Sequence, residues 1–246
     1  MFQLDILDFR WDMIWNYRDF FIRGIWVTIV LTVSGYIGGI VLGVLIGLGE
    51  TSKRKLIYWP SKLYVDLFRG TPMLVQILII HLAVIPAIFG QSFGYMVSGI
   101  TALVLNCAAY NAEIIRAGIQ SIDKGQMEAA RSLGLTHNQA MRKIILPQAF
   151  RRMIPPLGNE FIALLKDSSL VTVIAANDIL YASKIVAGAY QRFWEPYLVA
   201  AALYLMLTYL VTKLVAYVEK RTSNHYNPRK KTERQVLAND QSGKPA

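Results

Sequence analysis

The stretch that decides the class of fold is IWVTIVLTVSGYIGGIVLGVLIGLG, residues 25–49, which contains no charged residue. A second stretch, from Gly70 to Ile115, contains only one charged residue, Glu113. A helix rises about 1.5 Å per residue, so about 20 residues cross a hydrocarbon core of about 30 Å. Runs of this length and composition exclude an ordinary soluble domain and indicate a membrane protein built of helices.

Extending this reading along the 246 residues predicts an all-α, polytopic membrane protein with five transmembrane helices. We expect the spans at residues 24–48, 71–89, 95–115, 153–176 and 195–218. Residues 1–22 are expected to form an amphipathic interfacial segment, in which Trp11, Trp15 and Tyr17 anchor at the membrane surface. Residues 23–218 then form one membrane domain. Residues 219–246 form a basic tail that we expect to be disordered.

The net charge of +10 is distributed according to this topology. Lys and Arg gather after the first span, in the loop 116–152 and in the tail, whereas the turn 90–94 is uncharged. The positive-inside rule therefore places the N-terminus outside and the C-terminus in the cytoplasm, which agrees with an odd number of spans. Because topology accounts for the basic charge, we expect no nucleic-acid partner.

The loop 116–152 is a long polar segment within this hydrophobic chain. Its pattern predicts two short helices, the first over residues 126–133. Gly134 ends this first helix, because glycine adopts the left-handed conformation without steric penalty. Thr136 caps the second helix, and Gln139 completes a capping box. That helix is expected to run to Leu146 and to stop before Pro147.

Glycines recur at every fourth residue of the first span, at Gly35, Gly39, Gly43 and Gly47. They lie on nearly one face of a helix, so another helix can approach closely. The face either packs tightly within the subunit, which we favour, or forms a gliding or dimer contact.

Residues 58–68 form an amphipathic stretch after the first span, and the run from Arg69 to Pro72 should break it into an elbow that leads into the membrane. On the third span, Glu113 lies one turn before Arg116, which predicts a local ion pair. Asn106 on that span is polar, and polar groups in a bundle usually face protein or a water-filled cavity.

The fourth span is unusual because it carries Glu160, Lys166, Asp167 and Ser168. Each ion at bilayer depth costs at least about 2.5–3.5 kcal/mol, so these groups require partners or water. Lys166 either forms a salt bridge to a neighbouring helix or contributes to a polar path for a charged solute, and the sequence leaves both open. For Asp167 and Ser168 the path is favoured.

The motifs of enzymes are missing from the sequence. It contains no Walker A pattern, no metal-ligand spacing among its three histidines and no plausible Ser/His/Asp set. We therefore expect no catalytic residue, no metal site and no cofactor bound by this chain. His81 is expected to be a satisfied span residue, and Cys107 a small packing residue.

With these features, the chain resembles the permease subunits of bacterial ABC importers for polar amino acids, the histidine/glutamine/glutamate permease family. The resemblance rests on the pattern Glu-Ala-Ala-x3-Gly-x9-Ile-x-Leu-Pro, which is complete here in Glu128, Ala129, Ala130, Gly134, Ile144, Leu146 and Pro147. Three further motifs support it, at residues 66–76, 110–121 and 166–170. It covers most of the chain from about Gly24 to Val218 and implies the type I ABC importer permease fold.

The resemblance implies a function and a set of partners. The seven pattern residues would couple this chain to a dimer of ABC ATPase subunits, and those subunits would use the ATP. A second permease subunit, an external amino-acid-binding protein and the lipid of the bacterial inner membrane would complete the assembly. The solute would be an amino acid of the glutamine, glutamate, histidine, arginine or cystine class. Candidates for its path are Glu160, Lys166, Asp167, Ser168, Arg69, Gln76 and Asn106.

Two other functions stay open at this stage. The coupling pattern is shared by ABC permeases for other small solutes. A secondary transporter or channel that works alone would need no ATPase, although the inverted repeats typical of that class are not seen in the sequence.

Overall fold

The computed structural model describes residues 9–223, and every regular element in that range is a helix. The first half contains α1 (Trp11–Asn16), α2 (Arg18–Glu50), α3 (Lys55–Gly70), α4 (Met73–Ile79), the π-helix η1 (Ile80–Val84), α5 (Ile85–Phe89) and α6 (Gly94–Gln120). The second half contains α7 (Lys124–Ser132), α8 (His137–Ala140), the π-helix η2 (Met141–Ile145), α9 (Leu146–Asp167), the 3₁₀-helix η3 (Ser168–Ile174), α10 (Ile179–Tyr190) and α11 (Trp194–Ser223). The expected all-α fold is confirmed for residues 9–223, and the expected tail lies largely outside them.

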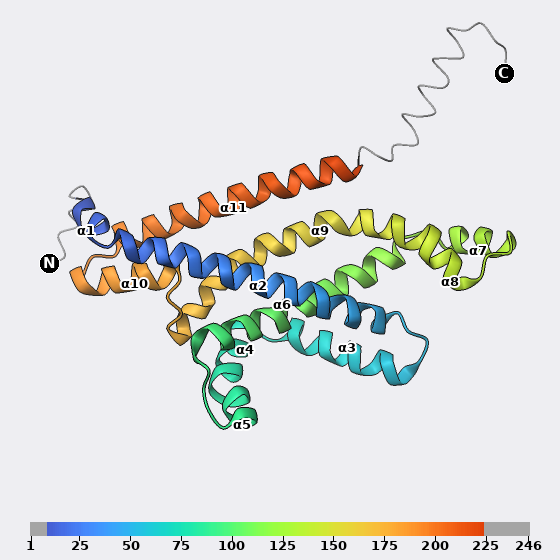
Figure 1. Ribbon diagram of the computed structural model, residues 1–246, viewed down its shortest axis with the longest axis horizontal. Helices are drawn as coiled ribbons and strands as arrows, with labels where there is room; N and C mark the ends of the chain where they lie inside the picture. The colour runs from blue at the N-terminus through green and yellow to red at the C-terminus, as the bar shows by residue number, and fades with distance from the viewer. Residues whose placement is uncertain (1–8, 224–246) are drawn as a thin grey trace, which may run out of the picture.

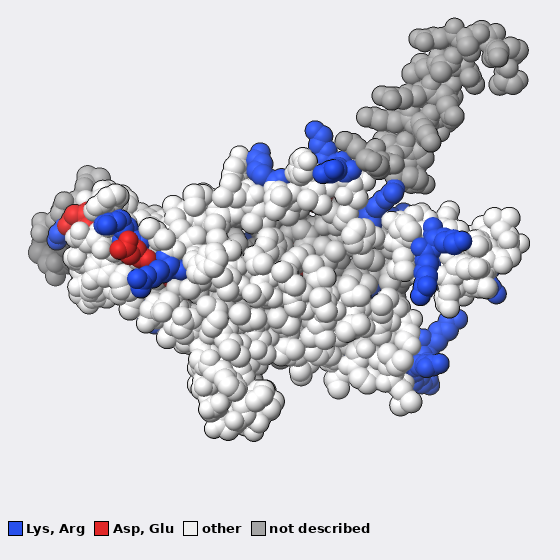
Figure 2. All heavy atoms as spheres, in the orientation of Figure 1, with Lys and Arg blue, Asp and Glu red and all other residues white. Residues whose placement is uncertain are grey.

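The long helices α2, α6, α9 and α11 run along the long axis of the molecule (Figure 1). Helices α1 and α10 lie at one end of this bundle, and α7 and α8 lie at the other, together with the turn between α2 and α3. Lys and Arg gather at the α7–α8 end, acidic and basic side chains mix at the α1 end, and the middle of the visible face is almost free of charge (Figure 2). An uncharged band between charged ends is the pattern of a protein that spans a membrane.

The glycine face of α2 packs against α6 within the chain. A Cβ added at Gly39 would lie 2.7 Å from Cβ of Cys107, and one added at Gly43 would lie 2.7 Å from Cβ of Asn111. Real Cβ atoms essentially never approach other atoms closer than 3.0 Å, so only glycine permits this separation of the helices. The prediction of tight packing within the subunit is confirmed, and Cys107 is fully buried at the contact.

Among residues 9–223, α2 and α11 are each long and apolar enough to cross a membrane alone. Two further pairs of helices, each bent at a short break, raise the number of possible spans to four if each pair is one span. The first pair is α3 with the segment from Met73 to Phe89, bent by 108°. The second is the segment from His137 to Ile174 with α10, bent by 47°. The expected elbow after Gly70 is therefore present. Five spans and the orientation of the termini stay predictions, and α2 begins before the expected domain boundary at residue 22.

The expectation that the second loop helix stops before Pro147 is wrong. The chain from His137 to Ile174 is one continuous helix through α8, η2, α9 and η3. Leu146, before the proline, has helical dihedrals of φ −59° and ψ −41°. Proline has no N–H and normally clashes with the carbonyl four residues earlier, but the π-helical turn η2 widens the backbone just before it. The second helix of the loop and the expected fourth span are therefore one element.

Candidate functional site

The candidate site is the helix pair α7–α8, and local capping fixes its shape. Asp123 caps α7 by accepting a hydrogen bond from the Gly125 N–H at 2.7 Å. The predicted capping box of α8 is confirmed, because the Gln139 N–H donates to Oγ1 of Thr136 at 3.3 Å and the Thr136 N–H donates to Oε1 of Gln139 at 2.8 Å. Gly134 adopts φ +83°, so the turn between the helices is left-handed as predicted.

An apolar cluster attaches this helix pair to the bundle. Its buried members are Ile115 and Ile122 from the end of α6 and the turn after it, and Ile145, Ala149 and Met153 from η2 and α9. Met127 of α7 packs against the same cluster. In addition, Arg152 donates to the carbonyl oxygen of Ser121 at 2.5 Å. The α7–α8 pair is therefore held in a definite position on α6 and α9.

Burial divides the seven pattern residues into two groups. Ala130 is buried, and Ile144 and Leu146 are half-buried, so these three support the pair from within. Glu128, Ala129 and Gly134 are exposed, as is Pro147 on α9. The pattern thus combines residues that hold α7–α8 together with residues that face outward.

Sequence reasoning missed one outward-facing residue of the α7–α8 pair. Leu133, directly after α7, is 83% exposed. Leu133 follows Ala129 by four residues, so the two lie on one face of the helical turn. A leucine at this spacing from Ala129 was the signal that could have found it. We call Glu128, Ala129, Leu133 and Gly134 the docking surface.

Of the polar candidates for a solute path, Gln76 and Asn106 come together at the elbow. The side-chain amide of Gln76 donates to the carbonyl oxygens of Phe68 and Thr71 at 2.8 and 3.0 Å. Its Oε1 accepts from Nδ2 of Asn106 at 2.8 Å. Both side chains are buried, so they brace the break between α3 and α4 against α6.

Arg69 joins a second polar group on the half of α6 that leads to α7. Its Nη1 lies 3.6 Å from Oε2 of Glu113, and its guanidinium lies 5.5 Å from the ring centre of Tyr110. Glu113 also forms the predicted ion pair with Arg116, at 2.5 and 2.9 Å. The predicted ion pair is confirmed, and Arg69 extends it to α3.

The fourth-span candidates do not form one cluster. Glu160 and Asp167 are both half-buried on α9. Ser168 is buried and donates to the carbonyl oxygen of Leu165 at 2.8 Å. Lys166 is exposed, and within residues 9–223 no carboxylate lies at ion-pair distance from it, so the salt bridge to a neighbouring helix is not formed in that part of the chain.

A buried carboxylate at the end of this helix went unnoticed in the sequence. Asp178 follows the break between η3 and α10 and is fully buried. It accepts hydrogen bonds from the Thr172 hydroxyl at 2.5 Å, from the Tyr181 N–H at 2.9 Å and from the Tyr204 hydroxyl at 3.0 Å. It thus ties η3, α10 and α11 together, and an Asp just before an apolar helical run was the available signal.

His81 in η1 shares a hydrogen bond of 2.8 Å with the Ser98 hydroxyl of α6. It is therefore a satisfied residue of the bundle, as predicted.

Comparison with known proteins places the chain in a family. Residues 39–224 match the model of the binding-protein-dependent transport system inner membrane component. An arginine transport system permease protein of Bacillus subtilis is 35% identical over 206 residues, which cover 84% of this chain and 94% of that protein. A probable glutamine ABC transporter permease protein of the same organism is 38% identical over the same shares.

Solved structures agree with these relatives. A chain from the crystal structure of an amino acid ABC transporter with histidines matches with a TM-score of 0.81 and 40% identity, covering 87% of this chain and all of that one. A chain of a methionine ABC transporter matches with a TM-score of 0.73 at 22% identity, which shows the shared fold. The chain therefore belongs to the binding-protein-dependent transport system inner membrane components, and among them to the amino-acid ABC permeases.

Proposed function

We propose that this chain is the translocation subunit of an ATP-driven importer for a polar amino acid of the glutamine, glutamate, histidine, arginine or cystine class. In this proposal a dimer of separate ATPase subunits binds and hydrolyses ATP, and this chain binds none. A second permease subunit and an external binding protein complete the transporter in the bacterial inner membrane. In the proposed topology the chain crosses the membrane five times, with the N-terminus outside and the docking surface in the cytoplasm, in accord with the positive-inside rule.

The observation that carries this proposal is the docking surface. A side chain as apolar as Leu133 gains about 1.5–3 kcal/mol when it is buried, yet here it projects from the end of a polar helix. Glu128, the exposed residue before Ala129, offers a charged acceptor, and Ala129 is small enough for close approach. Such a surface suits a protein partner with an apolar groove and a basic rim.

The fold offers a direct route from that partner to the membrane. Residues His137 to Ile174 form one helix, so α8 beside the docking surface is continuous with the segment that carries Glu160 and Asp167. Movement of the ATPase subunits would shift this helix between two arrangements. Coupling of this kind is a change between conformations and involves no chemical step in this chain.

The solute class rests on the relatives and on the polar groups of the bundle. The relatives are named for arginine and glutamine, and the solved neighbour for histidines. In this chain Arg69 on α3 and Glu160 and Asp167 on α9 offer both signs of charge. A zwitterionic solute requires both signs. The arrangement of Gln76 and Asn106 makes them supports of this region, so we assign them no contact with solute.

Reconstitution tests the proposal. The chain is placed in liposomes with its cognate ATPase and binding protein, and uptake of labelled arginine, glutamine and histidine is followed with and without ATP. Uptake of at least one of them should require the ATPase and ATP. Uptake by this chain alone, driven by an ion gradient, would instead establish a secondary transporter, and ATP-driven uptake of an unrelated solute only would refute the amino-acid assignment.

A further inference from the structure

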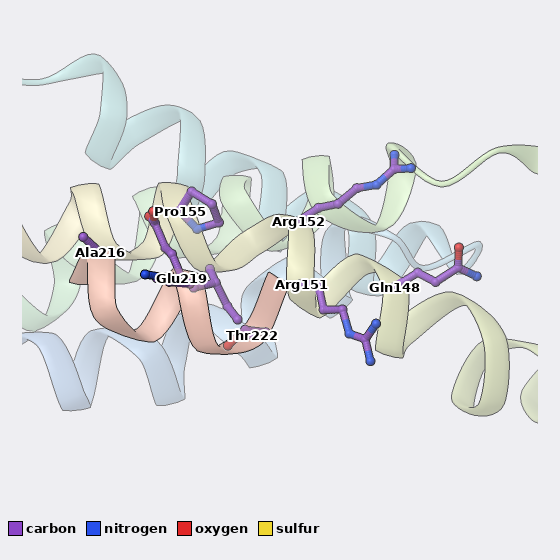
Figure 3. A pocket seen from close by; sticks show the side chains of 9 residues that line it. Gln148, Arg151, Arg152, Pro155, Ala216, Glu219 and Thr222 are labelled. Atoms are coloured by element: carbon purple, nitrogen blue, oxygen red, sulfur yellow. The ribbon is translucent and has the colours of Figure 1, made fainter. Parts of the chain in front are cut away.

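A cavity of about 560 Å³ opens between α9 and α11 near the end of the molecule that carries α7–α8 (Figure 3). From α9 it is lined by Gln148, Arg151, Arg152, Ile154 and Pro155, and from α11 by Ala216, Glu219, Lys220 and Thr222. None of these residues belongs to the docking surface or to the candidate solute path. The function proposed above leaves this cavity unexplained.

The mouth of the cavity is basic. Arg151, Arg152 and Lys220 contribute three positive charges against the single negative charge of Glu219. Arg151 and Arg152 leave α9 on opposite sides (Figure 3), and Arg152 donates to the Ser121 carbonyl. Gln148 and Thr222 add neutral hydrogen-bonding groups to the same lining. The lining therefore suits an anion with several oxygen acceptors.

A second, apolar cavity of about 260 Å³ continues from the first toward the middle of the bundle. It shares Ile154 with the basic cavity, and its other lining residues are Tyr36, Gly158, Phe161, Leu214, Val215 and Val218. At Gly158 the two helices touch so closely that an added Cβ would collide with Val215. From Arg151 to Phe161 the combined groove extends about 15 Å at 1.5 Å per residue.

We propose that this groove is a binding site for an anionic phospholipid. The phosphate occupies the basic cavity between Arg151 and Lys220, and one acyl chain lies in the apolar cavity along Gly158 and Phe161. Basic pockets between membrane helices on the cytoplasmic side are a recognised way of binding anionic headgroups. The order of the two cavities, charged at the end of the helices and apolar toward their middle, matches the order of headgroup and chain in a bilayer leaflet.

This order is also what distinguishes a lipid from other occupants. A soluble phosphate would use the basic cavity and leave the apolar one empty, whereas a hydrophobic segment of protein would gain nothing from the three cations. A phospholipid satisfies both halves at once. The proposal depends on α9 and α11 lying in the membrane and is independent of which solute is carried.

The test uses the full chain in phosphatidylcholine vesicles, with a trace of phosphatidylglycerol that carries a photoactivatable group in one acyl chain. After illumination, labelled peptides are mapped. We expect labelling of residues 154–161 and 214–218, with little labelling there by the matching phosphatidylcholine probe. Equal labelling by both probes, or labelling of other segments only, would overturn the proposal. It would also be overturned if free glycerol phosphate displaced the probe as effectively as unlabelled phosphatidylglycerol does.

Variants test the role of the charges. Each basic residue near an anionic headgroup contributes about fivefold to the affinity for the lipid. The double change R151Q/K220Q should therefore weaken labelling about 30-fold. E219Q should strengthen it about fivefold by the same measure. The double change K53Q/K55Q removes equal charge from the turn after α2 and the first residue of α3, and it should have no effect on these peptides. The exchange R151K/K220R keeps the charges and should retain labelling.

Two outcomes would assign the groove to another occupant and refute the lipid site. One is labelling that appears only after residues 224–246 are deleted, which would mean that the chain's own tail fills the groove. The other is an equal loss of labelling in K53Q/K55Q and R151Q/K220Q, which would reduce the effect to general attraction between basic protein and anionic membrane. Because labelling needs neither ATP nor solute, its result is separate from that of the uptake experiment.

Discussion

Small residues have opposite roles in two regions of the molecule, the contact between α2 and α6 and the α7–α8 pair. Along α2, glycines remove side chains so that two helices meet within the chain, and the contact is buried on both sides. On α7 and in the turn after it, Ala129 and Gly134 are small and exposed, next to Leu133, which residues 9–223 leave 83% exposed. The same residue types therefore serve folding in one region and, in the proposed function, recognition in the other. Substitutions should separate the two by what they damage.

The largest effect is expected from Gly43→Leu in α2. A Cβ here already meets Asn111 and the carbonyl of Ala108 within 3.0 Å, so a larger side chain must force the helices apart. Overpacking of this kind costs about 1–3 kcal/mol or more. We expect a loss of properly folded chain, measured by size-exclusion chromatography and thermal unfolding in detergent. Gly188→Leu in α10 is the control, because no atom lies within 4 Å of its added Cβ. Equal behaviour of the two variants would refute the packing role of the glycine face.

Next in size is Gly134→Val between α7 and α8. At φ +83° a β-branched residue is strained, so the turn cannot keep its shape, whereas Asn tolerates this conformation. Gly134→Val should abolish ATPase association and uptake while membrane insertion stays intact. Gly134→Asn should retain the turn and part of the binding, since the site has open space around it. Normal uptake by Gly134→Val would contradict the docking role, and equal losses in both variants would place the glycine itself in contact with the partner.

Leu133→Ala sharpens the comparison further, because it changes the docking surface without touching the backbone. Loss of a buried leucine from the complex should weaken ATPase binding roughly tenfold or more. The stability of the isolated chain should not change, since Leu133 is exposed. Leu56 of α3 is 92% exposed, and Leu56→Ala should leave ATPase binding unaltered. A titration of labelled ATPase onto each variant in nanodiscs measures the two affinities. Unchanged binding by Leu133→Ala would show that this residue is not part of the docking surface.

Gln76→Leu should act on folding and leave recognition unchanged. It deletes the amide that bonds the Phe68 and Thr71 carbonyls and leaves Asn106 without its acceptor. Unsatisfied buried groups cost about 1–3 kcal/mol each, so thermal stability should fall. Gln91→Leu, at an exposed position of the turn after α5, should be neutral. If Gln76→Leu instead raised the KM for uptake at unchanged stability, the side chain would belong to the solute path.

The smallest effect is expected from Thr136→Ala at the start of α8. Loss of a capping side chain costs about 1 kcal/mol, which should increase hydrogen exchange in α8 and weaken ATPase binding by about fivefold at most. Thr136→Ser keeps the hydroxyl and should restore both. Faster exchange throughout the bundle, instead of in α8 alone, would show that the cap supports the whole fold.

The sequence predicted the features that depend on neighbouring residues. Gly134 and the Thr136–Gln139 box are local motifs, and the glycine face of α2 follows from a simple spacing, so each was visible in the chain. The continuous helix through Pro147 was missed because a π-helical turn depends on how η2 packs, which no short motif encodes. The bond between Gln76 and Asn106 was missed because the two residues lie 30 positions apart in the sequence. Asp178 was missed for a different reason: its capping bond to Tyr181 is local, but its burial depends on α11, which supplies Tyr204.

The charges on α9 also have a consequence for biosynthesis. Glu160, Lys166 and Asp167 each oppose transfer into lipid, and this segment is apolar enough to cross a membrane only when taken together with α10. Helix α2 needs no such help, and α2 and α6 are both synthesised before α9 emerges from the ribosome. The glycine-packed pair can therefore be in place first and offer protein, instead of lipid, to the polar groups that follow. The order of the helices along the chain is thus also a workable order of assembly.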